Sequence, residues 1–485
     1  MRTRRDQVQA YRFVTRRIVS ALLAGDPETP NLPMRRLGLA VFGSVIAAAV
    51  VLGGVGAYGQ LTGNAAPLES NTLVIERETG ATYVFLDGRL HPTLNYASAR
   101  LILGDAQPTV RTMSQASIAD RPRGRAVGIV GAPDALPGPK ALTGLPWSVC
   151  DVPDPANPRR SYTRVVIDRP LAGGTPLAER GMLVSVDDER YLLTRDTRLR
   201  VSGGDQALTA LRMASAPTVR LSEQLLNAIP AGPVLRKPSI SGQGDTTGTL
   251  VGDGPGRIGQ VYRAAGEHYV LTRDGLVSIS EISALLLLSD GGRVTDITPD
   301  QAGRLLVRQQ VDAEGLPPTL PELHPARSGE TVVCATYRQG VDGAPAGTRI
   351  EVFDRPPAEL APDAADVTQV RQGARDAVRT AESVLLPGGK GVLVQAGQGA
   401  GEGAGAAPGA TVYLINEQGL RYPLGADALT ALGYEGVTPT VVPASLLALV
   451  PTGPVLDRER ALSFFEPAAA EPGPSAGPAT TTTGG

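Results

Sequence analysis

The sequence predicts an α+β protein with a single N-terminal transmembrane helix, followed by an elongated, pseudo-twofold extracytoplasmic domain of four small ββα-type repeats around a central β-rich core. Three observations lead to this prediction: a long uncharged apolar segment, a Tyr-led phrase that occurs four times, and a larger duplication that contains both cysteines. The chain of 485 residues is too long for one core. Its 58 Gly and 41 Pro favour many short elements joined by turns.

The transmembrane prediction depends on "LGLAVFGSVIAAAVVLGGVGAY" at residues 37–58, a run of 22 residues without a charge. As a helix it measures about 33 Å, which is enough to cross the hydrocarbon core of a bilayer. A cleaved signal peptide is the alternative. The run is longer than a typical signal core, however, and residues 1–36 precede it, so we expect an uncleaved anchor.

Charge on either side of the anchor predicts its orientation. Residues 1–36 contain eight arginines and three acidic residues, whereas residues 59–71 contain no Lys or Arg. The positive-inside rule therefore predicts a single-pass protein of the inner (plasma) membrane with a cytoplasmic N-terminus and residues 59–485 extracytoplasmic. The net charge of −2 and the lack of a basic stripe beyond the anchor predict no nucleic-acid partner.

The cytoplasmic segment "RRDQVQAYRFVTRRIVSALLAGD" places apolar residues at helical spacing, with arginines on much of the other face. This pattern predicts an amphipathic helix that lies on an anionic membrane surface or against a partner helix. A plain basic flank that only sets topology is the alternative. The residues that we expect to face membrane lipid or a partner are Tyr11, Phe13, Arg16, Arg17, Ile18 and Leu22.

The recurring phrase is a strand, a tight polar turn, a second short strand and an Ala/Leu-rich helix. Its copies are "YVFLDGRLHPTLNYASARLIL", "YLLTRDTRLRVSGGDQALTAL", "YVLTRDGLVSISEISALLLL" and "YLINEQGLRYPLGADALTAL", which begin at Tyr83, Tyr191, Tyr269 and Tyr413. Alternating apolar residues predict the strands, and the polar turns are hairpin signals. The candidate helix N-caps are Asn95, Asp205, Ser280 and Asp427.

A larger duplication surrounds these phrases. "WSVCDV" around Cys150 resembles "TVVCAT" around Cys334, and the intervals between matching positions in the two halves are about equal. Equivalent core strands commonly pair about a pseudo-twofold axis, where the two cysteines would come within the roughly 5.5 Å that a disulfide needs. Export places them in an oxidising space. We therefore predict a Cys150–Cys334 disulfide, with two buried free thiols as the alternative.

These patterns predict a division of the chain into eleven parts. The parts are 1–36, cytoplasmic helix and basic flank; 37–58, transmembrane helix; 59–70, linker; 71–118, repeat 1; 119–186, first half of the core; 187–238, repeat 2; 239–264, connector; 265–310, repeat 3; 311–408, second half of the core with a Gly-rich insertion; 409–460, repeat 4; and 461–485, disordered tail.

No catalytic signature is present. The sequence lacks a P-loop and an H-E-x-x-H motif, and its one G-x-S-x-G match, "GPSAG" at residues 473–477, lies in the low-complexity C-terminal tail and not between a strand and a helix as a nucleophile elbow does. The three histidines, His91, His268 and His324, show no metal-ligand spacing. We therefore predict no catalytic residue, no metal site and no cofactor.

Taken together, several segments resemble one family, EccB, the B component of type VII (ESX) secretion systems of actinobacteria. The segments are "TRRDQVQAYRFVTRRIVSALL", "PMRR", "TLVIERETGATYVFLDGRLHPTLNYASARLILG", "PRGRAVGIVGAPDALP" and "WSVC". The resemblance runs from residue 1 to about residue 460. It implies an inner-membrane subunit with one span, a four-repeat extracytoplasmic domain and a disulfide.

The resemblance also implies partners: the EccC motor ATPase, EccD and EccE in the same membrane complex, and a mycosin protease on the outer side. We therefore expect a non-catalytic structural subunit that anchors and assembles the channel for protein export. Two alternatives stay open. One is the ATPase or nucleotide-binding activity with which some family members are labelled, and the other is a cell-wall (peptidoglycan) binding module, which repeated small units would suit.

Overall fold

The computed structural model describes residues 4–25, 33–62, 67–154, 157–327, 329–340, 344–360, 380–397 and 409–464. Its contacts divide the chain into two compact units, one of residues 1–90 and 109–123, the other of residues 91–108 and 124–485. The disorder predicted for the tail beyond residue 464, and the Gly-rich stretch at 398–408, lie outside the described residues.

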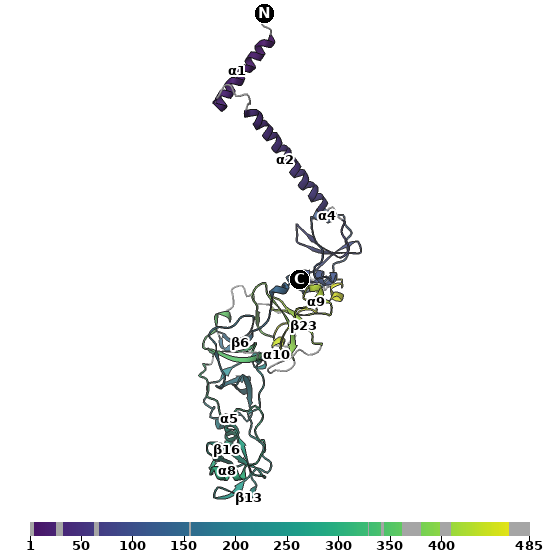
Figure 1. Cartoon of the computed structure of the whole chain (residues 1–485). Helices are drawn as coiled ribbons and strands as arrows, with labels where there is room; N and C mark the ends of the chain where they lie inside the picture. The colour runs from purple at the N-terminus through teal and green to yellow at the C-terminus, as the bar shows by residue number, and fades with distance from the viewer. Residues whose placement is uncertain are drawn as a thin grey trace, which may run out of the picture. The chain divides into compact units, whose positions relative to one another are not determined.

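The first unit begins with two long helices, α1 (Arg4–Ala24) and α2 (Pro33–Thr62), which are labelled in Figure 1. Among the described residues, Leu37–Tyr58 within α2 is the one segment long and apolar enough to cross a membrane. None of it is buried against the rest of the protein. The predicted anchor segment is therefore a continuous exposed helix.

A four-stranded sheet with the order β3-β2-β1-β4 follows α2. Strands β1 and β2 are antiparallel, and β4 returns parallel to β1. The bounds are β1 (Thr72–Glu76), β2 (Thr82–Leu86), β3 (Arg89–Pro92) and β4 (Val110–Met113). The helix α3 (Tyr96–Leu103) lies between β3 and β4 in the chain and belongs to the second unit.

The same strand order occurs three more times, as β11-β10-β9-β12, β17-β16-β15-β18 and β24-β23-β22-β25. In each sheet a meander of three strands leads into a short helix, and a fourth strand returns parallel to the first. The bounds are β9 (Met182–Val186), β10 (Glu189–Thr194), β11 (Thr197–Val201), α5 (Gly204–Ala210), β12 (Val219–Arg220), β15 (Val261–Ala264), β16 (Glu267–Leu271), β17 (Leu276–Ile279), α7 (Glu281–Leu287), β18 (Thr295–Asp296), β22 (Gly391–Gly397), β23 (Val412–Ile415), β24 (Arg421–Pro423), α9 (Ala428–Leu432) and β25 (Thr440–Pro443).

The Tyr-led phrase covers only the second and third strands and the helix of each sheet. The first strands β9, β15 and β22 therefore precede the boundaries that the phrase predicts at residues 187, 265 and 409. The predicted connector 239–264 contains β15 together with a separate hairpin, β13 (Thr246–Val251) and β14 (Gly254–Arg257). The phrase does not include the first strands, which precede its Tyr and its polar turn in the chain, and a long Gly-rich insertion separates β22 from β23.

The N-cap residues follow the sequence prediction at three of the four positions, Asn95, Ser280 and Asp427. Asn95 and Ser280 each accept a hydrogen bond from a backbone N–H of the first helical turn. The prediction for Asp205 is wrong, because Gly203 is the N-cap of α5 and adopts a left-handed φ of 111°. Asp205 lies in the first turn instead, where a carboxylate complements the helix dipole. Asp427 is at the N-cap of α9 but makes no side-chain capping bond.

A returning segment of chain covers the outer edge strand of each repeated sheet. Isolated parallel bridges mark this cover, for example Val201 with Leu235 and Leu424 with Leu456. An uncovered edge would present unpaired N–H and C=O groups to another chain. The Pro-Gly stretches after the helices therefore have a structural role that the turn pattern alone does not reveal.

The core of the second unit is a six-stranded sheet with the order β21-β7-β6-β19-β20-β8. Two hairpins, β6–β7 and β19–β20, meet where β6 pairs antiparallel with β19. Around it, buried residues from β6, β9, β19 and β22 form one cluster that includes Trp147 and Val394. The bounds are β6 (Trp147–Asp154), β7 (Asn157–Ile167), β8 (Thr175–Pro176), β19 (Val332–Arg338), β20 (Gly347–Phe353) and β21 (Ser383–Leu385).

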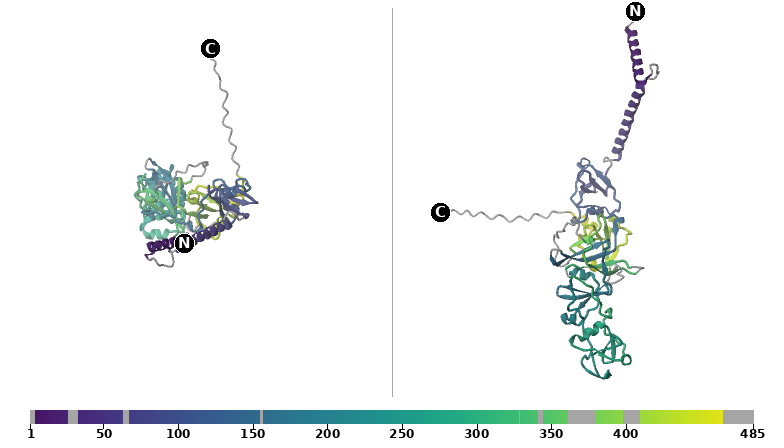
Figure 2. Two further views of the ribbon diagram at one scale, coloured as in Figure 1. Left: turned by 90° about the horizontal axis from the view of Figure 1, so that it is seen from above. Right: turned by 90° about the vertical axis from the view of Figure 1, so that its left-hand side faces the viewer.

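The other sheets of the second unit are arranged around this core. The sheet of β15–β18 lies at one end, next to the sheet of β9–β12 (Figure 2), and buried residues of the β9–β12 and β22–β25 sheets pack together on one face of the six-stranded sheet. Gln206 of α5 donates to the carboxylate of Asp290, just after α7, and the Lys237 ammonium pairs with the same carboxylate. Polar contacts thus join the second and third repeated sheets.

Candidate functional site

Two regions carry the residues that the sequence analysis selected: the exposed helix α1 and the centre of the six-stranded sheet. All six predicted membrane- or partner-facing residues are exposed on α1. Tyr11, Ile18 and Leu22 follow one another at intervals of seven and four residues and share one face of the helix. Phe13 lies on the opposite face, two residues from Tyr11, and the Arg17 guanidinium lies 5.7 Å from its ring centroid.

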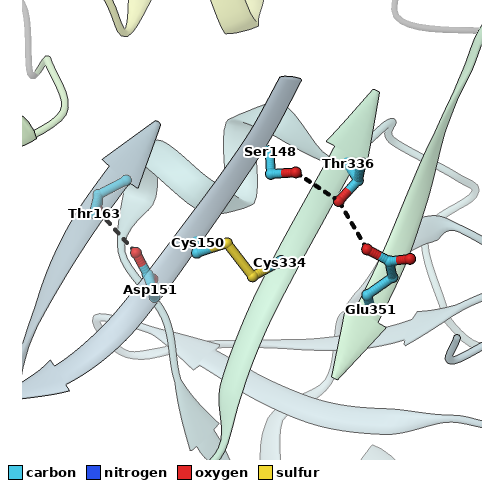
Figure 3. The surroundings of a disulfide bond; sticks show 7 residues. All are labelled: Ser148, Cys150, Asp151, Thr163, Cys334, Thr336 and Glu351. Atoms are coloured by element: carbon cyan, nitrogen blue, oxygen red, sulfur yellow. Dashed lines mark hydrogen bonds between the residues drawn. A yellow bond between two sulfur atoms is a disulfide. The ribbon is translucent and has the colours of Figure 1, made fainter. Parts of the chain in front are cut away.

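At the centre of the sheet, Cys150 of β6 lies directly opposite Cys334 of β19. A disulfide joins them, and their Cα atoms are 4.1 Å apart (Figure 3). Both side chains are fully buried. The predicted pairing is confirmed, and the free-thiol alternative is excluded, because the described residues include both cysteines of the chain.

Hydroxyl and carboxyl groups flank the disulfide on both sides (Figure 3). On one side, the hydroxyls of Ser148 and Thr336 lie 3.0 Å apart, and Thr336 donates to Glu351. Ser148 is buried and its hydroxyl lies beside a threonine hydroxyl and not beside a base, so it does not resemble an activated nucleophile. This chain of hydrogen bonds runs across three strands and ties the two hairpins together.

On the other side, Asp151 is a buried carboxylate that the sequence analysis missed. It accepts hydrogen bonds from the Ser222 backbone N–H, the Ser222 hydroxyl and the Thr163 hydroxyl. Burial raises the pKa of Asp151, and its hydrogen-bond donors oppose this only in part. Ser222 is the N-cap of α6 (Glu223–Ala228), so Asp151 attaches the second repeated sheet to the core.

The matching position in the second half is different. By the alignment of the two cysteines, Asp151 corresponds to Ala335, and by the match of the following Leu-Leu segments, Ser222 corresponds to Pro443. Pro443 precedes α10 (Ala444–Ala448), as Ser222 precedes α6. The carboxylate and the group it binds are thus both replaced in the other half. The signal for this contact in the sequence was one Asp inside the otherwise apolar strand "WSVCDV".

The turn of the second repeated sheet also binds the core. Asp196, in the "RDT" turn, accepts a hydrogen bond from the Ile350 backbone N–H and pairs with the Arg349 guanidinium at 2.9 Å. Its φ of 57° is the left-handed conformation that turn Asp residues tolerate. In the third sheet, the backbone N–H of Asp274 in the "RDG" turn donates to the Thr272 hydroxyl within the same turn. The acidic turn residue therefore binds the core in the second sheet, whereas in the third sheet it forms a hydrogen bond within its own turn.

The described residues bring no catalytic or metal-binding cluster together. No group of three His, Cys, Asp or Glu side chains within them is placed to hold a metal ion. His91 and His324 contact backbone carbonyls, at 3.1 and 2.7 Å, and His268 lies within β16. An open groove lies where β6 and β20 end. Its lining is rich in proline and contains Arg327, Glu330 and Arg355.

Comparisons with known proteins place the whole chain in one family. Residues 1–468 match the family described as "Type VII secretion system ESX-1, transport TM domain B". The chain is 29% identical to the ESX-1 secretion system ATPase EccB1 of Mycolicibacterium smegmatis strain MKD8, over 97% of each chain. It is 30% identical to the ESX-3 secretion system ATPase EccB3 of M. smegmatis strain ATCC 700084, over 96% of this chain and 92% of the relative.

Solved structures show the same fold. A chain of the intact ESX-5 inner membrane complex superposes with a TM-score of 0.67 at 24% identity, covering 99% of this chain and 98% of that one. The EccB3 dimer from the ESX-3 core complex matches with a TM-score of 0.61 at 27% identity, covering 81% of this chain and all of that one. With one apolar N-terminal helix, a sheet-rich remainder and a family match over residues 1–468, the chain belongs to the EccB family of type VII secretion systems.

Proposed function

We propose that this chain is a non-catalytic structural subunit of an inner-membrane type VII secretion complex, in which it anchors and assembles the channel for protein export. The family match over residues 1–468 carries the proposal. Solved relatives come from an ESX-5 inner membrane complex and from an ESX-3 core complex. The buried polar contacts of the core join sheets to one another, which suits a scaffold.

The proposed topology is a single span with the N-terminus in the cytoplasm and residues 59–485 outside. The arginines of residues 1–36 support it. A membrane-impermeant maleimide tests it on intact cells that express Asp253→Cys or Val8→Cys. We expect label at residue 253 alone, and label at both residues after lysis. Label at residue 8 in intact cells would reverse the proposed orientation.

Within the exported part we propose four copies of one repeat, arranged as two halves about a pseudo-twofold axis. The common strand order of the four sheets supports this, as does the meeting of the two hairpins at Cys150 and Cys334. The first and second sheets would correspond to the third and fourth. The division of the chain follows these sheets, with repeat boundaries moved to include β9, β15 and β22.

The proposed partners are EccC, EccD and EccE in the membrane complex, and a mycosin protease on the outer side. The test is affinity purification of the tagged full chain from native membranes, with identification of the co-purifying proteins. We expect these subunits in stoichiometric amounts. Recovery of the chain alone, from membranes that contain the other subunits, would overturn the structural proposal.

An ATPase activity is the second candidate, because relatives carry that name. The test is nucleotide binding and turnover by the purified full chain. Micromolar binding of ATP with turnover, lost on a single substitution, would replace the structural proposal. Peptidoglycan binding is a third candidate, for which four similar sheets offer repeated contact surfaces. Retention of the chain on isolated peptidoglycan would add that function to the scaffold.

A further inference from the structure

We propose that α1 is a lipid-binding helix that lies on the anionic surface of the membrane that α2 crosses. The sequence alone leaves three interpretations of this segment, namely a lipid-bound helix, a helix bound to a partner and a plain basic flank. The structure favours the first through the shape of the apolar face, the position of the arginines and the tether to α2.

The apolar face of α1 is a continuous exposed row. Successive residues turn by about 100° around a helix, so spacings of three and four residues keep side chains on one face. The row consists of Val8, Tyr11, Val14, Ile18 and Leu22, whose exposed fractions are 52%, 75%, 53%, 54% and 81%. From Val8 to Leu22 it extends for about 21 Å along the axis. A basic segment that only sets the orientation of the anchor requires no such apolar row.

Arg4 stands on the same face just before the row begins, and the other four arginines of α1 lie on its flanks without interrupting it. Arg5, Arg12 and Arg16 follow one flank at intervals of seven and four residues, and all three are exposed. Arg17 lies on the other flank, where it stacks on Phe13. Long cationic side chains beside an apolar face can reach lipid phosphates while the face itself enters the acyl boundary. A helix that bound a protein groove would not need cations along the border of its apolar face.

The connection to α2 keeps α1 near the membrane. Eight residues separate Ala24, the end of α1, from Pro33, the start of α2, and the apolar span begins four residues later. A chain of this length reaches at most about 30 Å. The local concentration of lipid headgroups around α1 is therefore high whichever partner the exported part binds. Each arginine near an anionic surface strengthens such binding about fivefold.

The experiment measures the depth of single nitroxide labels on the full chain. Ile18→Cys lies on the apolar row, and Gln9→Cys lies on the opposite face as its matched control. Labelling without reductant keeps the Cys150–Cys334 disulfide intact. Each variant is reconstituted into phosphatidylcholine vesicles with and without about 30% phosphatidylglycerol. Collisions with oxygen and with a water-soluble nickel chelate then report burial. A label at Val45 of α2 reports insertion of the span separately.

We expect the label at residue 18 to favour oxygen in anionic vesicles and to become accessible to nickel in neutral ones, while the label at residue 9 remains accessible to nickel in both. Arg12→Gln together with Arg16→Gln should lower the ratio of inserted to free α1 by about 25-fold in anionic vesicles. The exposed pair Arg304→Gln and Arg308→Gln should leave it unchanged.

Equal nickel access at residues 18 and 9 in anionic vesicles, with Val45 still buried, would overturn the proposal. The same conclusion follows if residue 18 is shielded only in native membranes that contain the other subunits, because a protein would then cover the row. Failure of Val45 to insert would instead contradict the proposed anchor.

Discussion

Cys150 and Cys334 occupy matching positions in the similar segments "WSVCDV" and "TVVCAT" and also face each other across β6 and β19. In an antiparallel pair of equivalent strands, only residues at the symmetry axis face their own counterparts. The proposed pseudo-twofold axis would therefore pass through the disulfide, where the two hairpins meet. It closes a loop of 184 residues and joins the halves at the point where their buried strands pair.

Loss of this bond should destabilise the core. A cross-link over so long a loop restricts the unfolded chain by about 4–5 kcal/mol in the chain-entropy model. We expect the double variant Cys150→Ser, Cys334→Ser to unfold at a clearly lower guanidinium concentration than the wild type. Tryptophan fluorescence of the buried Trp147 reports the transition.

Reductant provides the control for this prediction. It should lower the midpoint of the wild type and leave the double variant unchanged, because the chain has no other cysteine. Coincident unfolding curves for the oxidised wild type and the double variant would contradict a stabilising role for the bond.

Asp151 should make stability depend on pH. Burial raises its pKa in the folded protein above the reference value of 3.8. A raised folded pKa contributes stability that is fully present below the unfolded pKa and is lost as the pH rises through the folded pKa. The wild type should therefore lose stability relative to Asp151→Asn as the pH rises above about 4. Thermal midpoints of the two proteins at several pH values measure this difference, and parallel curves would contradict it.

Removal of the Asp151 side chain has a different effect. In Asp151→Ala the Ser222 N–H loses a buried acceptor, which should cost about 1–3 kcal/mol of unfolding free energy at acid pH, where ionisation of Asp151 has not yet destabilised the wild type. Asp151→Asn retains one oxygen for that N–H and should cost less. Denaturant titration compares the two variants. An equal loss of unfolding free energy in both variants would contradict this role, because Asp151→Asn keeps an acceptor for the Ser222 N–H and Asp151→Ala does not.

Asp196 and Asp274 occupy similar acidic turns in the second and third sheets, so their alanine variants can be compared directly. Asp196→Ala should destabilise the protein by about 1–3 kcal/mol, because it removes the acceptor for Ile350 and the partner of Arg349, and because Ala fits a left-handed φ poorly. Asp274→Ala in the third sheet should change the unfolding free energy by less than about 0.5 kcal/mol. Similar losses of unfolding free energy in both variants would mean that an acidic residue stabilises the turn itself, and that the contacts of Asp196 with Ile350 and Arg349 add little.

The side chain of Arg421, in β24, should stabilise the fourth repeated sheet. Its guanidinium lies 5.3 Å from the ring centroid of Tyr413 and donates to Thr452 and to the Leu447 carbonyl near the end of α10. Burial lowers its pKa, yet arginine stays charged at neutral pH. Arg421→Ala should cost about 1–3 kcal/mol, whereas Arg304→Ala, which breaks an exposed ion pair, should cost less than about 1 kcal/mol. Chemical denaturation of the two variants measures both values.

Much of the fold follows from local sequence patterns. The 22 uncharged residues predict the anchor helix, the Tyr-led phrases predict a hairpin and helix in each sheet, and Asn95 and Ser280 predict two caps. These features depend on neighbours within one turn or hairpin, where spacing and residue type decide the outcome. The repeated phrase does not predict the first strand of each sheet. Strand β22, for example, is separated from its phrase by a long Gly-rich insertion.

The sequence by itself determined the anchor, the count of repeated phrases and the equivalence of the two cysteines. Only the tertiary structure decided that Asp151 binds Ser222, that Asp196 binds Arg349, and that the apolar row of α1 is exposed and bordered by arginines. The first two contacts join residues that are 71 and 153 positions apart. Such pairings depend on how sheets pack, because a buried carboxylate is stable only where folding brings donors to it, and no local pattern specifies where those donors come from.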